Sequence, residues 1–260
     1  MVDGTTRRLL RTLLDRTAAA SDDLDVVDRR RFLTLTVTGF AGLLAACNSR
    51  GPDSAQKLLR YAERKNEGIE RWLLRHTQMD VVKPGARDAG AYFPKYYISE
   101  VMPKWDEAER GYWSLEVTGL VQQPWRFELS DLMRLPHVTQ RVNHYCVEGW
   151  TAVASWTGVR VRDLAKIVGA SPEASYVDFE SFDSGYHESW DIESATHPQT
   201  LIAYGMDGMY LGPGHGAPAR LHSPVKLGYK SVKYLTRIAF LPHRNGGYWS
   251  DRGYEWYAGT

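Results

Sequence analysis

Residues 143–150 read Asn-His-Tyr-Cys-Val-Glu-Gly-Trp, and the cysteine at position 146 is the most informative residue of the chain. The only other cysteine, Cys47, falls in a predicted processing site, so Cys146 has no obvious disulfide partner. A lone thiol is an oxidation hazard in an exported protein, and ligation of a metal as thiolate would explain its presence. The alternative is an inert cysteine of the core, which is the commoner situation for a single cysteine.

Residues 1–47 are predicted to form a twin-arginine export signal with a lipoprotein-like processing site. The run Arg29-Arg30-Arg31-Phe32-Leu33-Thr34 contains two arginines followed by x-Phe-Leu, and an apolar stretch continues to Ala46. This stretch is shorter than the roughly 20 residues of a membrane-spanning helix. It ends in Leu-Ala-Ala-Cys, which predicts Cys47 as the acylated first residue of the mature chain. A buried or amphipathic core helix is the alternative interpretation.

Export by the twin-arginine route has a chemical implication. The route serves proteins that fold, often around a cofactor, before they cross the membrane. We therefore expect an exported protein on the periplasmic or cell-surface side of the cytoplasmic membrane. Its attachment to the membrane is expected to depend only on a lipid anchor or a retained signal.

Composition excludes some classes of partner and suggests others. The formal net charge is +1, and no basic patch is dense enough to indicate nucleic-acid binding. Nine tryptophans and fifteen tyrosines are many for this length. Aromatic side chains fill cores, but they also line deep pockets, so the composition is compatible with a small-molecule site.

Hydrophobic periodicity predicts an α+β fold with many short strands and a few helices. Residues 48–91 are predicted as a tether and helical lead-in with a helix over 55–76, and residues 92–260 as one domain. A capped helix over 130–135 and an amphipathic helix over 159–168 are expected, the second ended by Gly169. Strand patterns cover 112–119, 125–129, 138–145, 176–182, 201–204, 209–211 and 234–241, with a hairpin turn at Asp207-Gly208.

Two further clusters have the composition of binding segments. His215-Gly216-Ala217-Pro218-Ala219-Arg220 places a histidine and an arginine on either side of a turn, where they could hold an anionic or heterocyclic group. The run from Lys226 to Lys233 contains three lysines, a serine (Ser231) and a glycine within eight residues. Their ammonium groups, the hydroxyl and the backbone N–H groups could bind a phosphate. The first cluster could also be only a turn, and the second only a solvated loop before an edge strand.

Taken together, these segments resemble the molybdopterin-dependent oxidoreductases of the sulfite oxidase fold. The resemblance covers about residues 112–241. Within the family, the chain is similar to the bacterial, exported, single-domain type, such as the catalytic subunit of the periplasmic methionine-sulfoxide reductases. The order and spacing of the pieces make it specific. They are CVEGW (146–150), WTGV (156–159), FESFD (179–183), LIAYGMDG (201–208), HGAPAR (215–220) and GYKSVK (228–233).

The resemblance implies a molybdenum-molybdopterin cofactor and assigns residues to it. Cys146 corresponds to the thiolate that binds molybdenum in such enzymes. Five other residues correspond to positions that hold the pterin and its phosphate: Ser181, His215, Arg220, Ser231 and Lys233. A further contact segment is expected within residues 92–97.

The resemblance also bears on the substrate. Two residues before the metal cysteine the family often has an arginine that can bind an anion, whereas this chain has His144. A histidine is charged only conditionally near neutral pH, which argues against sulfite and leads us to expect that sulfite turnover would fall as pH rises through the His144 pKa. We place His144 and Tyr186 in the expected substrate pocket.

The expected reaction is two-electron oxygen-atom transfer on an S- or N-oxide, including protein methionine sulfoxide, or on a small sulfur compound. We expect a separate electron-transfer partner, a membrane haem protein or cytochrome, because the sequence shows no haem domain before the core and no dimerisation domain after it. Three alternatives are a sulfite dehydrogenase, a non-catalytic redox or interaction subunit, and a zinc protein. The scattered histidines and missing second cysteine make zinc the weakest of them.

Overall fold

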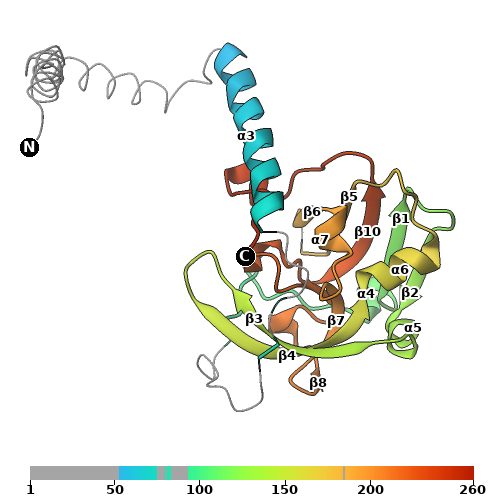
Figure 1. Ribbon diagram of the computed structural model, residues 1–260. Helices are drawn as coiled ribbons and strands as arrows, with labels where there is room; N and C mark the ends of the chain where they lie inside the picture. The colour runs from blue at the N-terminus through green and yellow to red at the C-terminus, as the bar shows by residue number, and fades with distance from the viewer. Residues whose placement is uncertain (1–52, 75–78, 80, 83–92, 184) are drawn as a thin grey trace, which may run out of the picture. The chain divides into compact units, whose positions relative to one another are not determined.

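The computed structural model describes residues 53–74, 79, 81–82, 93–183 and 185–260 (Figure 1). The predicted export signal and processing site lie outside these residues. The chain divides after Ala62 into two units, and the second, Glu63–Thr260, contains both β-sheets. Within the described residues, no helix is both long enough and apolar enough to span a bilayer.

One five-stranded sheet has the order β2-β1-β10-β5-β6. Strand β1 runs parallel to β10, and every other neighbouring pair is antiparallel. Alternation of apolar and polar residues explains β1, whose Leu115 and Val117 are buried on one face. The strands are β1 (Ser114–Gly119), β2 (Trp125–Glu128), β5 (Tyr176–Ser181), β6 (His187–Asp191) and β10 (Leu235–Leu241).

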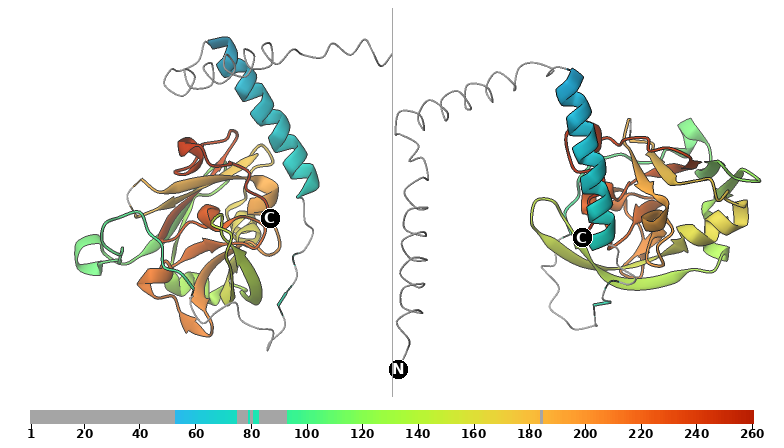
Figure 2. Two further views of the ribbon diagram at one scale, coloured as in Figure 1. Left: turned by 90° about the vertical axis from the view of Figure 1, so that its left-hand side faces the viewer. Right: turned by 45° about the horizontal axis from the view of Figure 1, so that its top comes forward.

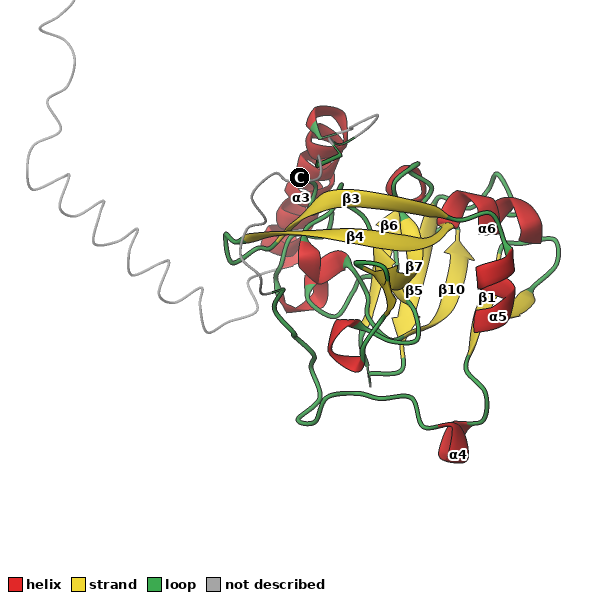
Figure 3. Cartoon of the chain, turned by 90° about the horizontal axis from the view of Figure 1, so that it is seen from below, coloured by secondary structure: helices red, strands yellow, loops and turns green. Residues whose placement is uncertain are grey.

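The second sheet has the order β3-β4-β7-β8, and β9 pairs with β7. Strands β3 and β4 form the long curved hairpin seen in the right view of Figure 2 and labelled in Figure 3. Gly158 lies at a bulge in the β4–β7 pairing, where a Cβ atom would collide with the Ile202 carbonyl oxygen. The strands are β3 (Val138–Tyr145), β4 (Thr151–Arg160), β7 (Leu201–Met206), β8 (Met209–Tyr210) and β9 (Arg220–His222).

Helices lie before and between the strands. Helix α6 is amphipathic and buries Val161, Leu164 and Val168, and it ends at Gly169, whose φ of 64° is the left-handed conformation that glycine adopts easily. The α-helices are α3 (Asp53–Leu73), α4 (Glu107–Arg110), α5 (Leu129–Arg134), α6 (Val161–Val168) and α7 (Ile192–Ala195). Three 3₁₀ turns are η1 (Pro213–His215), η2 (Gly228–Lys230) and η3 (Ser250–Arg252).

The main core lies between the sheets and α6. Both sheets contribute to it, since Val117, Phe179 and Ile238 come from the first sheet and Val159 and Ile202 from the second. The packing of the two sheets brings the end of β3, the end of β5 and the start of β9 into one region. This convergence is what creates the pocket described below.

The α+β prediction is confirmed, and most predicted elements are present. The sequence analysis did not predict residues 151–158 of β4, and it did not predict β6 or β9. The predicted helix over 159–168 starts later, because Val159 and Arg160 still belong to β4 and pair with β7. The N-terminus of α5 is closed by a capping box between Glu128 and Asp131 rather than from Ser130.

Candidate functional site

Cys146 is the first residue after β3, at the tip of the β3–β4 hairpin. The Cys146 N–H donates to the Trp150 carbonyl at 2.9 Å, and the Gly149 N–H donates to the Cys146 carbonyl at 3.0 Å. Gly149 has a φ of 86°, which a residue with a side chain adopts only with strain. This tight turn fixes the half-buried thiol at the edge of a cavity.

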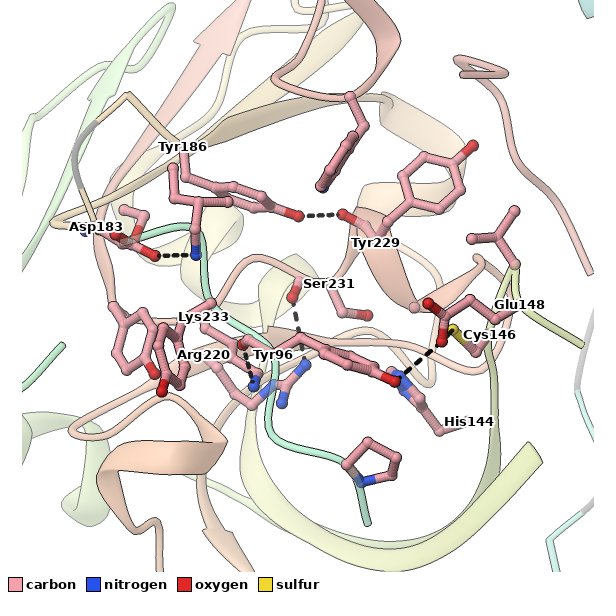
Figure 4. A pocket seen from close by; sticks show the side chains of 18 of the residues that line it. Tyr96, His144, Cys146, Glu148, Asp183, Tyr186, Arg220, Tyr229, Ser231 and Lys233 are labelled. Carbon is pink, nitrogen blue, oxygen red and sulfur yellow. Dashed lines mark hydrogen bonds between the residues drawn. The ribbon is translucent and has the colours of Figure 1, made fainter. Parts of the chain in front are cut away.

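The cavity has a volume of about 350 Å³ and is lined mainly by aromatic and polar side chains (Figure 4). Seven of the eight predicted site residues line it, and the eighth, His215, lies behind its wall, with its ring 5.6 Å from that of Phe93. The sequence prediction therefore placed its candidates in one location. They are Cys146, Ser181, Arg220, Ser231, Lys233, His144 and Tyr186.

A carboxylate stands beside the thiol. Oε2 of Glu148 lies 3.9 Å from the Cys146 Sγ and accepts hydrogen bonds from the Tyr96 hydroxyl at 3.0 Å and the Trp150 indole N–H at 2.9 Å. These two bonds lower the pKa of Glu148. Burial, above all, raises the pKa of the Cys146 thiol. The thiol is therefore flanked by a negative charge, which disfavours a second anion at this end of the pocket.

Arg220 provides a buried positive charge at another side of the pocket. Its guanidinium donates to the carbonyl oxygens of His215, Leu221 and Ser231 at 3.1–3.3 Å and lies 4.9 Å from the centre of the Trp156 ring. No carboxylate in the described part of the chain forms an ion pair with it. Burial lowers the pKa of Arg220 to about 10, which still leaves it charged at neutral pH.

Lys233 adds a second basic group to the pocket. Its ammonium donates to the carbonyl oxygens of Tyr96 at 2.7 Å and Gly214 at 2.8 Å. Burial, followed by the nearby charge of Arg220, lowers its pKa to about 7. Arg220 and Lys233 have no acidic ion-pair partner among the described residues, and they are suited to bind an anion such as a phosphate, which would in turn favour the charged form of Lys233.

Several buried polar atoms around these cations lack a hydrogen-bond partner. They are the hydroxyls of Ser231 and Tyr234 and the Nδ1 atom of His215. Buried polar groups are nearly always satisfied in folded proteins, so unpaired donors grouped around a cationic pocket indicate a polar ligand. The residues present therefore fit a group that combines an anion with hydrogen-bonding heterocyclic parts.

The prediction that His144 could carry a conditional charge near neutral pH is wrong. The side chain is buried and stacks on His222, with ring centres 5.5 Å apart, and His222 stacks in turn on Trp156. Burial, with Arg220 and Lys233 nearby, lowers the His144 pKa to about 3. A neutral His144 cannot produce the expected decline of sulfite turnover near neutral pH.

Ser181 and Tyr186 belong to the wall formed by the end of β5 and the turn after it. The Ser181 hydroxyl accepts a hydrogen bond from the Asp183 N–H at 2.9 Å. The Tyr186 hydroxyl donates to the Tyr229 carbonyl at 2.5 Å, and burial raises its pKa. Tyr186 therefore shapes the pocket as a neutral side chain whose proton is already engaged.

Asp183 also positions the segment that covers this wall. Its carboxylate accepts hydrogen bonds from the Ile98 N–H at 3.0 Å and from the Ser99 hydroxyl. Phe93 and Tyr96 of the predicted segment 92–97 line the pocket, as does Ile98 just after it. Their contact with the cofactor stays a prediction.

The interpretation of all three lysines of the 226–233 run as phosphate ligands is wrong for two of them. Lys226 is buried and binds the Asp191 carboxylate at 3.1 Å, and Lys230 is buried and binds Glu188 at 2.5 Å. Both cations are already neutralised within the protein. Only Ser231 and Lys233 of this run line the pocket with polar groups available to a ligand.

Sequence reasoning missed Glu148, Asp183 and Tyr234 as pocket residues. Glu148 belongs to the quoted motif, and its position two residues after the thiol was the available signal. Asp183 is the last residue of the FESFD segment, and its position two residues after Ser181 was a signal of the same kind. Tyr234 belongs to the predicted strand 234–241, but it precedes β10 and has a φ of 57°, so the strand pattern did not place its side chain in the pocket.

Comparison with known proteins assigns the family. Residues 101–249 match the family described as the oxidoreductase molybdopterin binding domain. The chain therefore belongs to the molybdopterin-binding oxidoreductases; it is an oxidoreductase of the sulfite oxidase fold, and its cofactor is a molybdenum-molybdopterin.

Individual relatives agree with this assignment. Over 252 residues the chain is 34% identical to a candidate protein-methionine-sulfoxide reductase subunit, YedZ1, of Azospira oryzae, covering 96% of this chain and 95% of that protein. It is 36% identical to the catalytic subunit MsrP of Gluconobacter oxydans, over 53% of this chain and 50% of that protein. The sulfane dehydrogenase SoxCD of Paracoccus pantotrophus shares the fold, with a TM-score of 0.51 and 23% identity over 55% of this chain and 41% of that chain.

The Lys230–Glu188 pair leads to a stability prediction. Glu188 also accepts hydrogen bonds from the Trp249 N–H and the Ser250 hydroxyl, so Glu188→Ala leaves a buried, unpaired ammonium beside the loop that carries Ser231 and Lys233. We expect a loss of about 3–5 kcal/mol in the free energy of unfolding, measured by urea denaturation. The control is Glu180→Ala, which removes a half-exposed ion pair with Arg237 and should cost at most about 1 kcal/mol. Equal losses for the two variants would contradict the assignment.

Proposed function

We propose that this chain catalyses the two-electron reduction of an S-oxide, with the methionine sulfoxide of a protein as the favoured substrate. The reaction consumes two electrons and two protons and yields a thioether and water. The observation that carries the proposal is the thiol of Cys146 facing an aromatic pocket beside a carboxylate and a neutral histidine, an environment suited to an uncharged substrate. The similarity to a candidate protein-methionine-sulfoxide reductase subunit along 96% of the chain supports the same substrate class.

The cofactor would be held by residues from several elements. Cys146 would supply the thiolate ligand, Arg220, Lys233 and Ser231 would bind the phosphate end, and His215 would contact the pterin. Ser181 would contribute a hydroxyl at the opposite wall. The bound cofactor supplies two-electron exchange of an oxygen atom, and the task of the protein is to position it and to admit the substrate.

The side chains near Cys146 would select the substrate. The rings of Phe93, Tyr96 and Trp150 provide apolar surface for the thioether part of a sulfoxide. The charge of Glu148 repels sulfite at the thiol, and the neutral His144 offers it no cation. Arg220 and Lys233 would be engaged by the cofactor phosphate and would attract a second anion only weakly.

The competing non-catalytic interpretation predicts a fold without a working site. The chain retains the thiol at the pocket edge together with a buried Arg220 that lacks an acidic partner in the described residues. A protein that only binds a partner gains nothing from a buried, unneutralised cation, because such a charge is costly without a ligand. The retained arrangement therefore favours an enzyme.

The first test of the proposal is Cys146→Ser. We expect this variant to lose sulfoxide reduction with an artificial electron donor, because the thiolate ligand is gone, and to retain most of its pterin through Arg220 and Lys233. Turnover and pterin content are measured on the same purified protein. The matched control is Cys47→Ser, which removes the other cysteine and should leave turnover in detergent unchanged. Full turnover by Cys146→Ser would refute the metal-ligand role.

The second test separates sulfoxide from sulfite. Glu148→Gln removes the charge beside the thiol and keeps an oxygen that can accept from Trp150 and Tyr96. We expect the kcat/KM for sulfite oxidation to rise by about threefold to tenfold, with little change for a neutral sulfoxide. Glu180→Gln, outside the pocket, is the control. An equal change for both substrates would show that Glu148 does not select against anions.

We further propose that the protein is exported by its twin-arginine signal, is tethered through Cys47, and receives electrons from a separate membrane haem protein or cytochrome. The support is the N-terminal sequence and the likeness to relatives named as reductase subunits. Changing Arg29 and Arg30 to lysine should leave the protein in the cytoplasmic fraction of the cell. Unchanged export of this variant would refute the signal.

A further inference from the structure

The polarity of helix α3, drawn in blue in Figure 1, is the reverse of that expected for a surface helix. In its second half, Trp72 is 78% exposed, Leu73 60% and Ile69 55%. The side chain of Glu67 is only 12% exposed. A helix that packs on a domain normally buries its apolar face and exposes its charges. Helix α3 therefore presents apolar surface that the domain does not use.

The charged side of the helix is held by the domain of residues 63–260. Arg244 binds Glu63 at 2.5 Å and Glu67 at 3.3 Å, and Arg71 binds Glu67 at 3.1 Å. The Arg71 guanidinium also lies 6.0 Å from the centre of the Trp256 ring. These contacts fix the rotation of residues 63–73 of the helix about its axis. Trp72 is exposed as a consequence of this orientation.

The apolar stripe runs along the helix itself. Positions 58, 62, 69 and 73 share one face because residues three, four and seven apart in a helix lie on the same side. They are occupied by Leu58, Ala62, Ile69 and Leu73, and all four are exposed. Trp72 borders this face. The stripe therefore has two apolar parts, one at each end of α3, with Lys65 on the same face between them.

Charge distinguishes the surface beside the stripe. The acidic residues Glu63 and Glu67 bind Arg244 on the domain side, whereas Lys57 and Arg64 are exposed next to the stripe. The outward surface thus combines aliphatic side chains, a tryptophan and basic residues. This is the composition of helices that lie in the interface of a membrane containing anionic lipids.

We propose that α3 lies in the surface of an anionic lipid bilayer, with its apolar stripe toward the acyl chains. The basic residues beside the stripe favour a lipid surface over a protein partner, because lipid phosphates supply matching negative charge along the whole helix. The helix begins six residues after Cys47, so the predicted lipid anchor would bring it to the membrane. The proposal is independent of the reaction that the pocket catalyses.

The test uses the full chain bound to vesicles of phosphatidylcholine with phosphatidylglycerol, with and without brominated acyl chains. Emission lost in Trp72→Phe defines the share of fluorescence that belongs to Trp72. We expect brominated lipids to remove at least about half of this share, because the ring lies among the acyl chains. Replacing Lys57 and Arg64 together by glutamate should reduce this quenching by at least about half, because the anionic lipids then repel the helix.

The control is Trp125→Phe, which defines the share of another exposed tryptophan, outside the helix. That share should be quenched by iodide from water and spared by brominated lipid. The proposal is overturned if the Trp72 share behaves in the same way, if lipid quenches both shares equally, or if Trp72 is shielded only after a membrane protein is added. None of these readouts depends on turnover, so they fail or succeed independently of the proposed reduction of S-oxides.

Discussion

The buried guanidinium of Arg220 imposes the strongest constraint on this structure. A charged group removed from water is costly unless it is paired, and the described residues provide Arg220 with carbonyl oxygens and the face of Trp156 but no carboxylate. Carbonyl dipoles offset part of this cost and leave a positive potential in the pocket. The free hydroxyls of Ser231 and Tyr234 lie in the same region. The pocket thus has the positive charge and the free hydroxyl groups to bind an anion, in agreement with the membership of the chain in a cofactor-binding family.

The neighbouring lysines show that only particular basic side chains are left for a ligand. Lys226 and Lys230 come from the same short run as Lys233, yet each is buried against its own carboxylate, Asp191 or Glu188. These pairs anchor the loop to β6, the edge strand of the first sheet. Lys233 is left to face the pocket. One run of sequence therefore combines two cations that hold the structure and one cation available to a ligand.

Much of the fold could be predicted because its determinants are local. Alternation of apolar residues located β1 and β3, and Gly169 marked the end of α6. The position of Cys146 after a strand followed from the same pattern. Strand β6 escaped prediction because nearly all of its residues are buried, polar ones included, which removes the alternation. Strand β9 is only three residues long and begins with an arginine.

The residues that line the candidate site could largely be predicted, but their charge states and ion-pair partners could not. Which residues gather around Cys146 followed from segments whose order resembled a known family. Whether His144 is charged, or which lysine is already paired, depends on burial and on partners far away in sequence. Lys230, for example, meets Glu188 only because β6 and the loop are brought together by the tertiary fold. Such information is absent from any local pattern.

The pocket draws its walls from segments that span from Phe93 to Tyr254, and no stretch of the chain contains it alone. Both sheets must be in register before Arg220, Lys233 and Cys146 face a common space. Capture of a ligand there would consequently report that the whole domain is correctly folded.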